Sequence, residues 1–379
     1  DMRVKKQYLF KNAVLLLLII VIPVVISQPV IAVTLAEAKE VQRKAEESLV
    51  LLRLALEDGQ DVSDIVPMMQ QVKVLGDAKK IGQANALLDD ILLRFERLAV
   101  PNDLDSQQIF RNPKKVSIIG LKFSAMEPFI SRDGKYLFFN SDKNDIPHSD
   151  KNIYYAERID DLTFRYKGEV KGINSDVVDG VPTMDRYNNF YYVSVKNYNR
   201  KHDFVTVYRG KFKDGYVKDI RAIPELSLQK PGWLNMDIEI SADGLTLYST
   251  QTYFGDGPPP TKSYFFSASL RDNKFFVDDN SEDIFRNINT DDLEYAASIS
   301  SDGLEIFFTR GSGFRTSPKF ASFYASRSDV NSPFGTPEPI KAITGFAEAP
   351  AITDEGKLIY YHKFDKDRFY IYALERTMH

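Results

Sequence analysis

Hydrophobic residues in the C-terminal three-quarters of the chain fall into pairs of short apolar runs, and a turn sequence separates the two runs of each pair. The clearest pairs span residues 127–139, 237–248 and 298–308, and looser copies span 179–192 and 349–361. The turn in the clearest copies is Asp-Gly, a strong local signal for a β-hairpin because glycine adopts positive φ without a steric cost. The pattern predicts five β-hairpins.

The hairpins recur at a regular period. Their turns centre on Asp133, Asp185, Asp243, Asp302 and Glu355, with gaps of 52, 58, 59 and 53 residues. A third apolar run follows each hairpin, at 153–157, 205–209, 264–270, 320–327 and 369–375, and a fourth, less regular segment such as 337–343 comes after it. Four strands in a repeat of this length are typical of one propeller blade. The sequence predicts a mainly β protein with a five-bladed β-propeller.

The last repeat has only three strands before the chain ends, so one strand of the fifth blade must come from elsewhere if no sheet edge is to stay open. Residues 116–119, Val-Ser-Ile-Ile, precede the first repeat and match the segment before the fifth. We expect 116–119 to be the outer strand of the fifth blade, so that an N-terminal strand closes the ring.

The segment 33–100 has a different periodicity. Apolar residues at three- and four-residue spacing, from Ala38 to Leu56, from Ile65 to Leu75 and from Ile81 to Phe95, each form one face of a helix. We expect a small helical hairpin or three-helix unit, whose apolar faces form a core or, alternatively, bind a partner. The polar stretch 101–113 is interpreted as a linker to a propeller spanning 114–379.

The first 32 residues resemble an export signal. Arg3, Lys5, Lys6 and Lys11 precede the apolar run 13–26, and Val30-Ile31-Ala32 offers a cleavage site. Extended through Val33, the same run would serve as an uncleaved membrane anchor. Either alternative predicts a periplasmic or extracellular protein. Contact with a membrane is expected only through this segment, if it is not cleaved.

Composition narrows the function classes. The chain has 379 residues, a net charge of −4 and no cysteine. The near-neutral charge argues against nucleic acid as a partner, and the lack of cysteine excludes disulfides and zinc–thiolate sites. The four histidines show no metalloprotease spacing, and no phosphate-binding glycine loop opens a helix.

The repeat resembles the WD40-like, TolB-type β-propeller repeat. Ser131, Asp133, Gly134 and Lys135 match best, followed by Ser241-Ala-Asp-Gly and Ser300-Ser-Asp-Gly; no copy has the proline that usually precedes the aspartate, and Arg186 replaces the glycine of the second copy. The resemblance covers residue 116 to the C-terminus. It implies an extracytoplasmic propeller that binds proteins or saccharides through one face.

Acidic residues mark the start of the innermost strands. Glu127, Asp179 and Asp237 each lie six residues before the turn residue, and Glu294 and Glu348 lie near the corresponding places in the last two repeats. Three interpretations compete: carboxylates that cap strand ends or pair with neighbouring cations, an acidic funnel that captures a ligand or cation, and a carboxylate pair that hydrolyses glycosides.

The loops expected around the channel mouth hold further candidates. Trp233 either stacks on a ligand or wedges between blades, and Tyr253 and Phe254, beside a run of three prolines, form either a stacking platform or a rigid loop. The oxygen-rich loop 141–152 is interpreted as solvated, with a calcium site as the alternative. No other cofactor is expected.

The sequence thus favours an exported, non-enzymatic binding or scaffold protein that uses the channel-mouth face to bind a protein or saccharide. Its binding residues would be Glu127, Asp179, Trp233, Asp237, Tyr253, Phe254, Glu294 and Glu348. The alternative is a carbohydrate-active hydrolase whose catalytic carboxylates come from Glu127, Asp179, Asp237, Glu294 and Glu348.

Overall fold

The computed structural model describes residues 35–57, 62–99, 109–142, 150–199, 203–255, 257–313 and 319–377. The predicted export segment at 1–32 and most of the predicted linker lie outside these residues. Contacts divide the chain into two compact units, Asp1–Ser106 and Gln107–His379.

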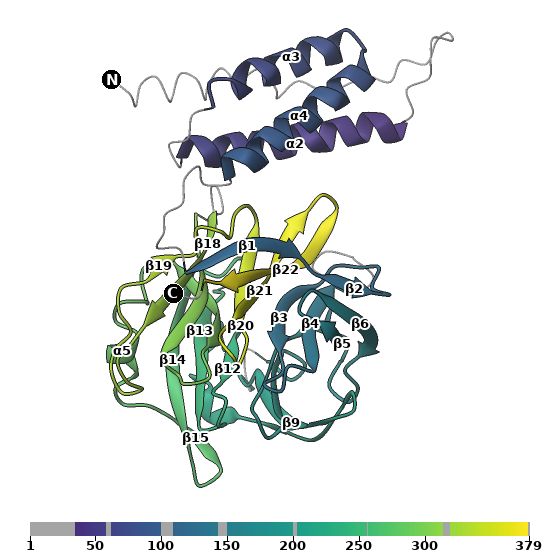
Figure 1. Ribbon diagram of the computed structural model, residues 1–379. Helices are drawn as coiled ribbons and strands as arrows, with labels where there is room; N and C mark the ends of the chain where they lie inside the picture. The colour runs from purple at the N-terminus through teal and green to yellow at the C-terminus, as the bar shows by residue number, and fades with distance from the viewer. Residues whose placement is uncertain are drawn as a thin grey trace. The chain divides into compact units, whose positions relative to one another are not determined.

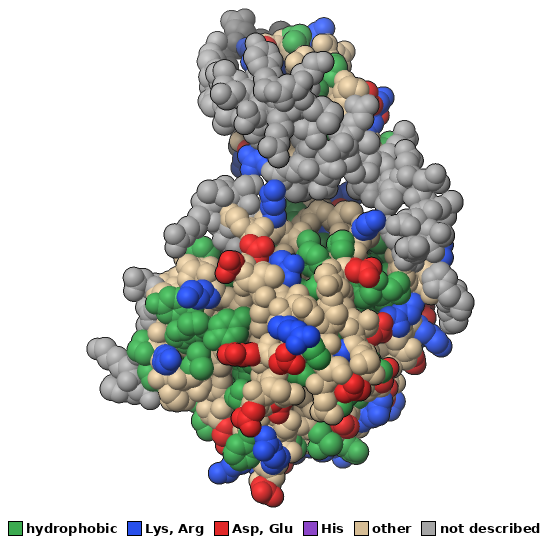
Figure 2. Space-filling model, turned by 90° about the vertical axis from the view of Figure 1, so that its left-hand side faces the viewer, with side chains coloured by type: hydrophobic (Ala, Val, Ile, Leu, Met, Phe, Trp, Pro, Cys, Tyr) green, Lys and Arg blue, Asp and Glu red, His purple; other side chains and the backbone are tan. Residues whose placement is uncertain are grey.

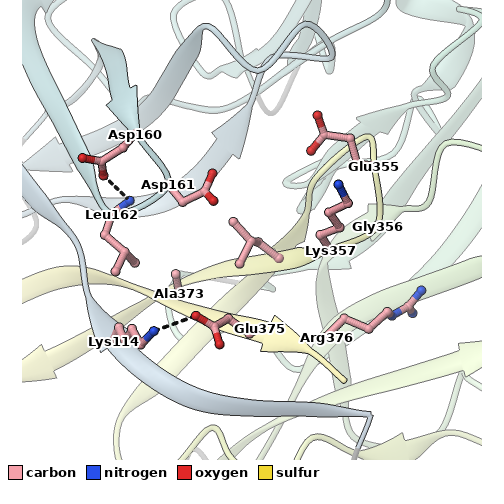
Figure 3. A pocket seen from close by; sticks show the side chains of 11 residues that line it. Lys114, Asp160, Asp161, Leu162, Glu355, Gly356, Lys357, Ala373, Glu375 and Arg376 are labelled. Atoms are coloured by element: carbon pink, nitrogen blue, oxygen red, sulfur yellow. Dashed lines mark hydrogen bonds and ion pairs between the residues drawn. The ribbon is translucent and has the colours of Figure 1, made fainter. Parts of the chain in front are cut away.

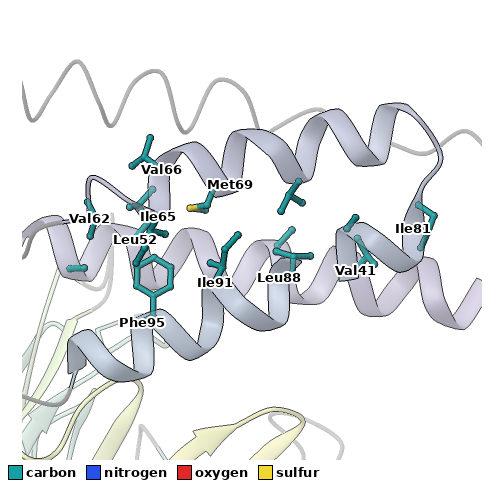
Figure 4. Packing of buried hydrophobic residues seen from close by; sticks show 14 residues of the cluster. Val41, Leu52, Val62, Ile65, Val66, Met69, Ile81, Leu88, Ile91 and Phe95 are labelled. Carbon is teal, nitrogen blue, oxygen red and sulfur yellow. The ribbon is translucent and has the colours of Figure 1, made fainter. Parts of the chain in front are cut away.

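The described part of the first unit consists of three helices, α2 (Leu35–Glu57), α3 (Ile65–Asp77) and α4 (Ile81–Ala99). Their apolar faces meet in one core, in which Leu52 of α2, Met69 of α3 and Ile91 of α4 are buried together (Figure 4). The predicted three-helix unit is therefore confirmed, and its apolar faces pack against one another. None of the described helices is both long enough and apolar enough to cross a membrane.

The second unit is a ring of β-sheet blades (Figure 1). Blade 1 contains β3 (Met126–Ile130), β4 (Tyr136–Asp142), β5 (Lys151–Asp160) and β6 (Thr163–Glu169). Blade 2 contains β7 (Asp179–Met184), β8 (Asn189–Ser194), β9 (Val207–Lys213) and β10 (Tyr216–Ala222). Within each blade, neighbouring strands are antiparallel and consecutive in sequence.

Blades 3 and 4 are joined into one sheet by a single parallel bridge between Ser263 and Leu293. Blade 3 contains β12 (Ile238–Ile240), β13 (Thr246–Tyr253), β14 (Lys262–Arg271) and β15 (Lys274–Val277), and β11 (Trp233–Leu234) pairs with the end of β13. Blade 4 contains β16 (Leu293–Ile299), β17 (Glu305–Ser312), β18 (Lys319–Ser326) and β19 (Glu338–Pro339). Short helical turns, η2 (Pro224–Leu226) and α5 (Ser281–Ile284), lie in the connections.

Blade 5 contains β20 (Ala347–Ile352), β21 (Leu358–Asp365) and β22 (Arg368–Arg376), and an N-terminal strand completes it. The described residues thus form a five-bladed propeller closed by an N-terminal strand, as the sequence predicts. The innermost strands β3, β7, β12, β16 and β20 all start at one face, called here the mouth face, and end in hairpin turns at the opposite hairpin face.

The Ser-x-Asp-Gly turns explain why the hairpins are readable from sequence. In blade 1 the Ser131 hydroxyl donates to Asp133 (2.7 Å) and accepts from the backbone N–H of Tyr136 (2.9 Å), while Asp133 also accepts from the N–H of Lys135. Gly134 takes a φ of +71°, which a side chain would disfavour. The turns at Ser241 and Ser300 repeat these bonds, so each turn is closed by residues within one short segment.

Neighbouring blades pack against one another through five hydrophobic clusters. For example, Phe138 of blade 1 packs edge-on against Phe190 of blade 2, and Phe164 of blade 1 packs edge-on against Tyr360 of blade 5. The remaining clusters join blades 2 and 3, 3 and 4, and 4 and 5. Each sheet is therefore buried on both faces, which accounts for its runs of consecutive apolar residues.

The closing strand differs from the prediction. It is β1 (Phe110–Lys115), which pairs antiparallel with β22, whereas β2 (Ser117–Ile119) pairs in parallel with β6 of blade 1. The prediction that 116–119 closes blade 5 is therefore wrong, and part of the predicted linker is a strand. Only Phe110 of β1 is buried, and Pro113 lies in a register shift between Arg111 and Lys114. An edge strand with one buried residue and a proline carries no apolar alternation that sequence reasoning could detect.

Candidate active site

The five predicted acidic residues do not occupy one position in the blades. The innermost strands of blades 2 and 4 each contain a β-bulge, and the last residues paired before it are Gly180 and Tyr295. Asp179 and Glu294 each lie one residue earlier. Glu127 lies within the bulge of blade 1 at a φ of +51°, and the matching residue of blade 2, by its bulge and its φ of +52°, is Val181. The predicted equivalence of Asp179 with Glu127 is therefore wrong, because Asp185 occupies the turn position of Ser131 and not that of Asp133. The N–H of Asp185 donates to the Asn189 carbonyl as the N–H of Ser131 donates to the Tyr136 carbonyl.

Asp179 and Glu294 are held within their own blades. Asp179 is fully buried and accepts from the backbone N–H and the hydroxyl of Ser175, both at 2.6 Å. Glu294 is also fully buried and accepts from Thr290, through its N–H and hydroxyl, and from the Arg310 guanidinium (2.7 Å). Both carboxylates accept hydrogen bonds from the segment just before their own strand. This is the strand-capping role that the sequence analysis gave as one alternative.

Glu127, Asp237 and Glu348 instead interact across the centre of the ring, although they belong to blades 1, 3 and 5. Burial and the negative charges of Glu127 and Glu348 raise the pKa of Asp237 to about 8, against an opposing hydrogen bond from the Ala296 N–H and the charge of Lys151. At neutral pH Asp237 is therefore protonated and able to donate a proton.

The pKa of Glu348 is shifted in the opposite direction to that of Asp237. Its carboxylate accepts a hydrogen bond from the Tyr295 hydroxyl of blade 4 and lies 3.3 Å from Nε2 of His362. The His362 imidazole, the Tyr295 hydroxyl and the charge of Lys151 hold the pKa of Glu348 below its usual value despite burial. Glu348 is thus a fixed negative charge beside a protonated Asp237, and such a separation of pKa values is typical of acid–base sites.

Glu127 is the most exposed of the three carboxylates, with 27% of its side chain accessible and Lys151 Nζ 3.9 Å away. Gly180 of blade 2 faces it, and a Cβ at Gly180 would lie 3.7 Å from Glu127 Oε2. A larger residue at position 180 would therefore fill space beside the Glu127 carboxylate. Among the three, Glu127 is the one that a ligand in the mouth reaches first.

A buried ion pair that sequence reasoning missed lies towards the hairpin face. Arg132, in the blade 1 turn, lies 2.8 Å from Glu239 of blade 3, and both side chains are only 3% exposed. Glu239 also accepts from the hydroxyl of Thr183 in blade 2 (2.5 Å) and from the N–H of Ile299 in blade 4. One glutamate therefore links four blades at the hairpin face. Its only signal in the sequence is an acid in Ile238-Glu-Ile240, where the other copies have uncharged residues.

Aromatic side chains surround the mouth face. Trp233 and Tyr253 are half-buried with ring centroids 5.1 Å apart, and Tyr264 packs on Trp233 at 5.9 Å. Trp233 thus packs on the aromatics of its own blade. Phe254 is half-buried next to them. A second group lies on blades 4 and 5, where Phe346 stacks on Phe320 at 4.8 Å.

A hollow of about 700 Å³ lies on the hairpin face between blades 1 and 5, far along the strands from the carboxylates (Figure 3). Most of its charged side chains already have partners: Lys114 pairs with Glu375, and Asp160 accepts from the Leu162 N–H, as Figure 3 shows. Arg376 is held by both oxygens of Glu305. The hollow therefore presents few groups for a ligand.

The described residues contain no group of three or more His, Asp or Glu side chains arranged to hold a metal ion. The central residues 143–149 of the candidate calcium loop lie outside the described part of the chain. On the face shown in Figure 2, basic and acidic side chains are interspersed without a stripe of one sign.

Solved structures share the propeller fold. One described as a glycoside hydrolase matches with a TM-score of 0.51 and 13% identity over 71% of this chain and 93% of that chain. A thermostable family-43 glycoside hydrolase matches with a TM-score of 0.46 and 11% identity over 70% and 93%. A TolB described as putative, from Agrobacterium tumefaciens, matches with a TM-score of 0.37 and 10% identity over 69% and 78%.

No protein-family model and no curated protein matches the sequence. At these identities the likeness establishes the fold alone.

Proposed function

We propose that this protein is a carbohydrate-active hydrolase that cleaves glycosidic bonds with carboxylates from the centre of the propeller. The single observation that carries the proposal is the interaction of Asp237 with Glu127 and Glu348, which come from two other blades, with the pKa of Asp237 raised and that of Glu348 lowered. Glycoside hydrolysis needs one carboxylic acid to protonate the leaving oxygen and a second, ionised carboxylate to activate water or attack the sugar. The fold shared with a glycoside hydrolase agrees with this choice by analogy only.

In this proposal Asp237 is the general acid, because its raised pKa keeps the proton on the carboxyl at neutral pH. Glu127 is the base or nucleophile, since it is the most exposed of the three carboxylates and the first charge that raises the pKa of Asp237. Glu348 does not react. Held by Tyr295 and His362, it supplies a fixed negative charge that helps keep Asp237 protonated.

Trp233, Tyr253 and Phe254 would bind sugar rings at the blade 3 side of the mouth. Asp179 and Glu294 are not proposed as catalytic residues, because both are fully buried and accept hydrogen bonds from residues of their own blades. The export segment expected at 1–32 would place the enzyme in the periplasm or outside the cell, where polysaccharides occur.

The test is hydrolysis of 4-nitrophenyl glycosides and of plant and algal polysaccharides by the wild type, Asp237→Asn and Glu127→Gln. Each variant should lose about 100-fold or more in kcat, the typical contribution of general acid–base catalysis. Glu157→Gln is the matched control, because Glu157 lies on β5 and pairs with Lys167 on the outer strand β6. Turnover that survives in both site variants would overturn the proposal.

A second candidate is the exported binding protein without turnover. Two observations favour it, because both restrict the access of a substrate. Glu348 is hydrogen-bonded to Tyr295 and lies against His362, and Asp237 is buried. Binding of a saccharide or protein at the mouth without hydrolysis of any substrate in the panel would select this function.

A further inference from the structure

Four phenylalanines form a connected group on the mouth face, called here the phenylalanine patch: Phe320, Phe346, Phe364 and Phe369. Phe346 directly precedes β20, and Phe364 lies near the end of β21. Phe369 is the second residue of β22, and Phe320 is the second residue of β18 of the neighbouring blade. The strand pairing of Ala347 with Lys363 and of Gly311 with Phe320 places all four at the ends where the innermost strands start.

The rings touch one another in a chain. Phe346 stacks on Phe320 at 4.8 Å and meets Phe369 edge-on at 5.2 Å, and Phe364 meets Phe369 at 5.4 Å. Phe346 is 43% exposed and Phe364 is 42% exposed. The exposed rings are therefore contiguous and not scattered singly over the surface.

The patch continues into the carboxylate site. Phe369 packs edge-on against the imidazole of His362 at 5.1 Å, and the same imidazole lies 3.3 Å from Glu348. Two rings, those of Phe369 and His362, therefore connect Phe346 to Glu348 of the carboxylate site. A ligand on Phe346 must offer a flat apolar face to the rings and hydroxyl groups to the nearby carboxylates. A pyranose or furanose ring offers both.

The size of the patch argues against a protein partner. At the observed exposures, two phenylalanines present roughly 200 Å² together, since a whole aromatic side chain buries about 150–250 Å². A stable protein–protein interface needs about 800 Å² on each partner. One stacked sugar ring fits the smaller area.

We propose that the phenylalanine patch is a saccharide-binding subsite in which Phe346 stacks on a neutral sugar next to the one at the carboxylates. This inference rests on the proposed hydrolase function and narrows its substrate to chains of at least two sugars. It predicts that Phe346 contributes to the affinity for polymers and not to the affinity for single-sugar substrates.

The experiment compares the full-length wild type with Phe346→Ala and Phe276→Ala. Phe276 is the matched control, because it is 45% exposed but lies on β15, the outermost strand of blade 3. Native gels containing arabinan, xylan, galactan or laminarin measure binding by retardation. Phe346→Ala should weaken binding of the retained polysaccharide about tenfold, the order expected for one lost aromatic contact, and Phe276→Ala should not change it.

Kinetics separate this inference from the hydrolase proposal. Phe346→Ala should raise KM for an oligosaccharide of the retained polymer and leave kcat/KM for the 4-nitrophenyl monoglycoside unchanged. Retardation that depends on Phe346 without any turnover supports the subsite and refutes the hydrolase. The subsite is refuted if Phe346→Ala binds the polymer as the wild type does, if no polymer retards the wild type, or if the variant changes only self-association in sedimentation.

Discussion

The Nδ1 atom of His362, on blade 5, accepts a hydrogen bond from the backbone N–H of Glu127, on blade 1, at 3.0 Å. Because Nδ1 accepts, the neutral imidazole carries its proton on Nε2, which lies 3.3 Å from Glu348. One buried ring therefore joins the first and last blades and orients a carboxylate of the site. The closure of the propeller and the geometry of the site depend on the same side chain.

Two substitutions of His362 should separate its two contacts. In His362→Asn the side-chain oxygen replaces Nδ1 and keeps the bond from Glu127, but the amide does not reach Glu348. In His362→Gln the amide nitrogen reaches Glu348, but the acceptor for Glu127 is lost. We expect His362→Gln to cost about 1–3 kcal/mol of unfolding free energy, because a buried N–H is left unpaired.

His362→Asn should act on Glu348 instead. The imidazole lowers the pKa of Glu348, so its loss should raise that pKa. Urea denaturation and NMR titration of the Glu348 carboxyl check the two variants. Identical effects in both would show that His362 does not hold its two neighbours separately.

The stability of Asp237→Asn relative to the wild type should depend on pH. The folded-state pKa of Asp237 is raised from 3.8 to about 8, so its ionisation opposes folding, and stability is lost as pH rises from about 4 through 8. Asparagine mimics the protonated form and avoids this loss. The melting temperature of the variant should therefore match the wild type near pH 4 and exceed it increasingly up to pH 8. A constant difference across this range would contradict the raised pKa.

Catalysis by the wild type should fall on the alkaline side as Asp237 loses its proton. We expect kcat/KM to decrease tenfold per pH unit above about 8, since only the protonated carboxyl donates to the leaving oxygen. Glu348→Gln removes one of the charges that raise the pKa of Asp237, so its alkaline limb should lie at lower pH. The check is a pH–rate profile on an aryl glycoside, and an unmoved limb in Glu348→Gln would remove Glu348 from this role.

The Arg132–Glu239 pair should be a main support of the ring. Arg132→Met leaves Glu239 buried without its cation, which typically costs about 3–5 kcal/mol. Arg186→Met is the matched control, because Arg186 pairs with Asp354 at the surface, where such pairs contribute about 0–1 kcal/mol. Equilibrium urea unfolding measures both. Adding Glu239→Gln to Arg132→Met should recover part of the loss, and equal losses in the two arginine variants would refute the role of the buried pair.

The identity of the closing strand is testable with one residue from each candidate. Phe110 of β1 is buried and meets Phe307 edge-on at 5.7 Å, whereas Ile119 of β2 is exposed. Phe110→Ala should cost about 3–5 kcal/mol, as large-to-small core substitutions do, and Ile119→Ala less than about 0.5 kcal/mol. Thermal unfolding of the two variants decides the question. A larger loss of stability in Ile119→Ala than in Phe110→Ala would show that 116–119 closes the ring.

Local chemistry made the repeats readable from the sequence. A Ser-x-Asp-Gly turn is closed by hydrogen bonds within one short segment. Asp133, Asp243 and Asp302 therefore predict hairpins independently of the tertiary structure. The helical unit was readable for the same reason, because residues such as Leu88 and Ile91 lie on one face at a fixed spacing. The count of five blades followed from the period of these signals.

Only the tertiary structure decided which acids meet. Glu127, Asp237 and Glu348 come from three blades, and Asp179 lies two residues before Val181, the residue of blade 2 that matches Glu127. The closing strand and the Arg132–Glu239 pair likewise depend on partners more than 100 residues away. By itself the sequence determined the repeats, the fold class and the set of candidate acids, because those follow from neighbouring residues. The meeting of the carboxylates was decided by ring closure, because it depends on how separate sheets are placed around one axis.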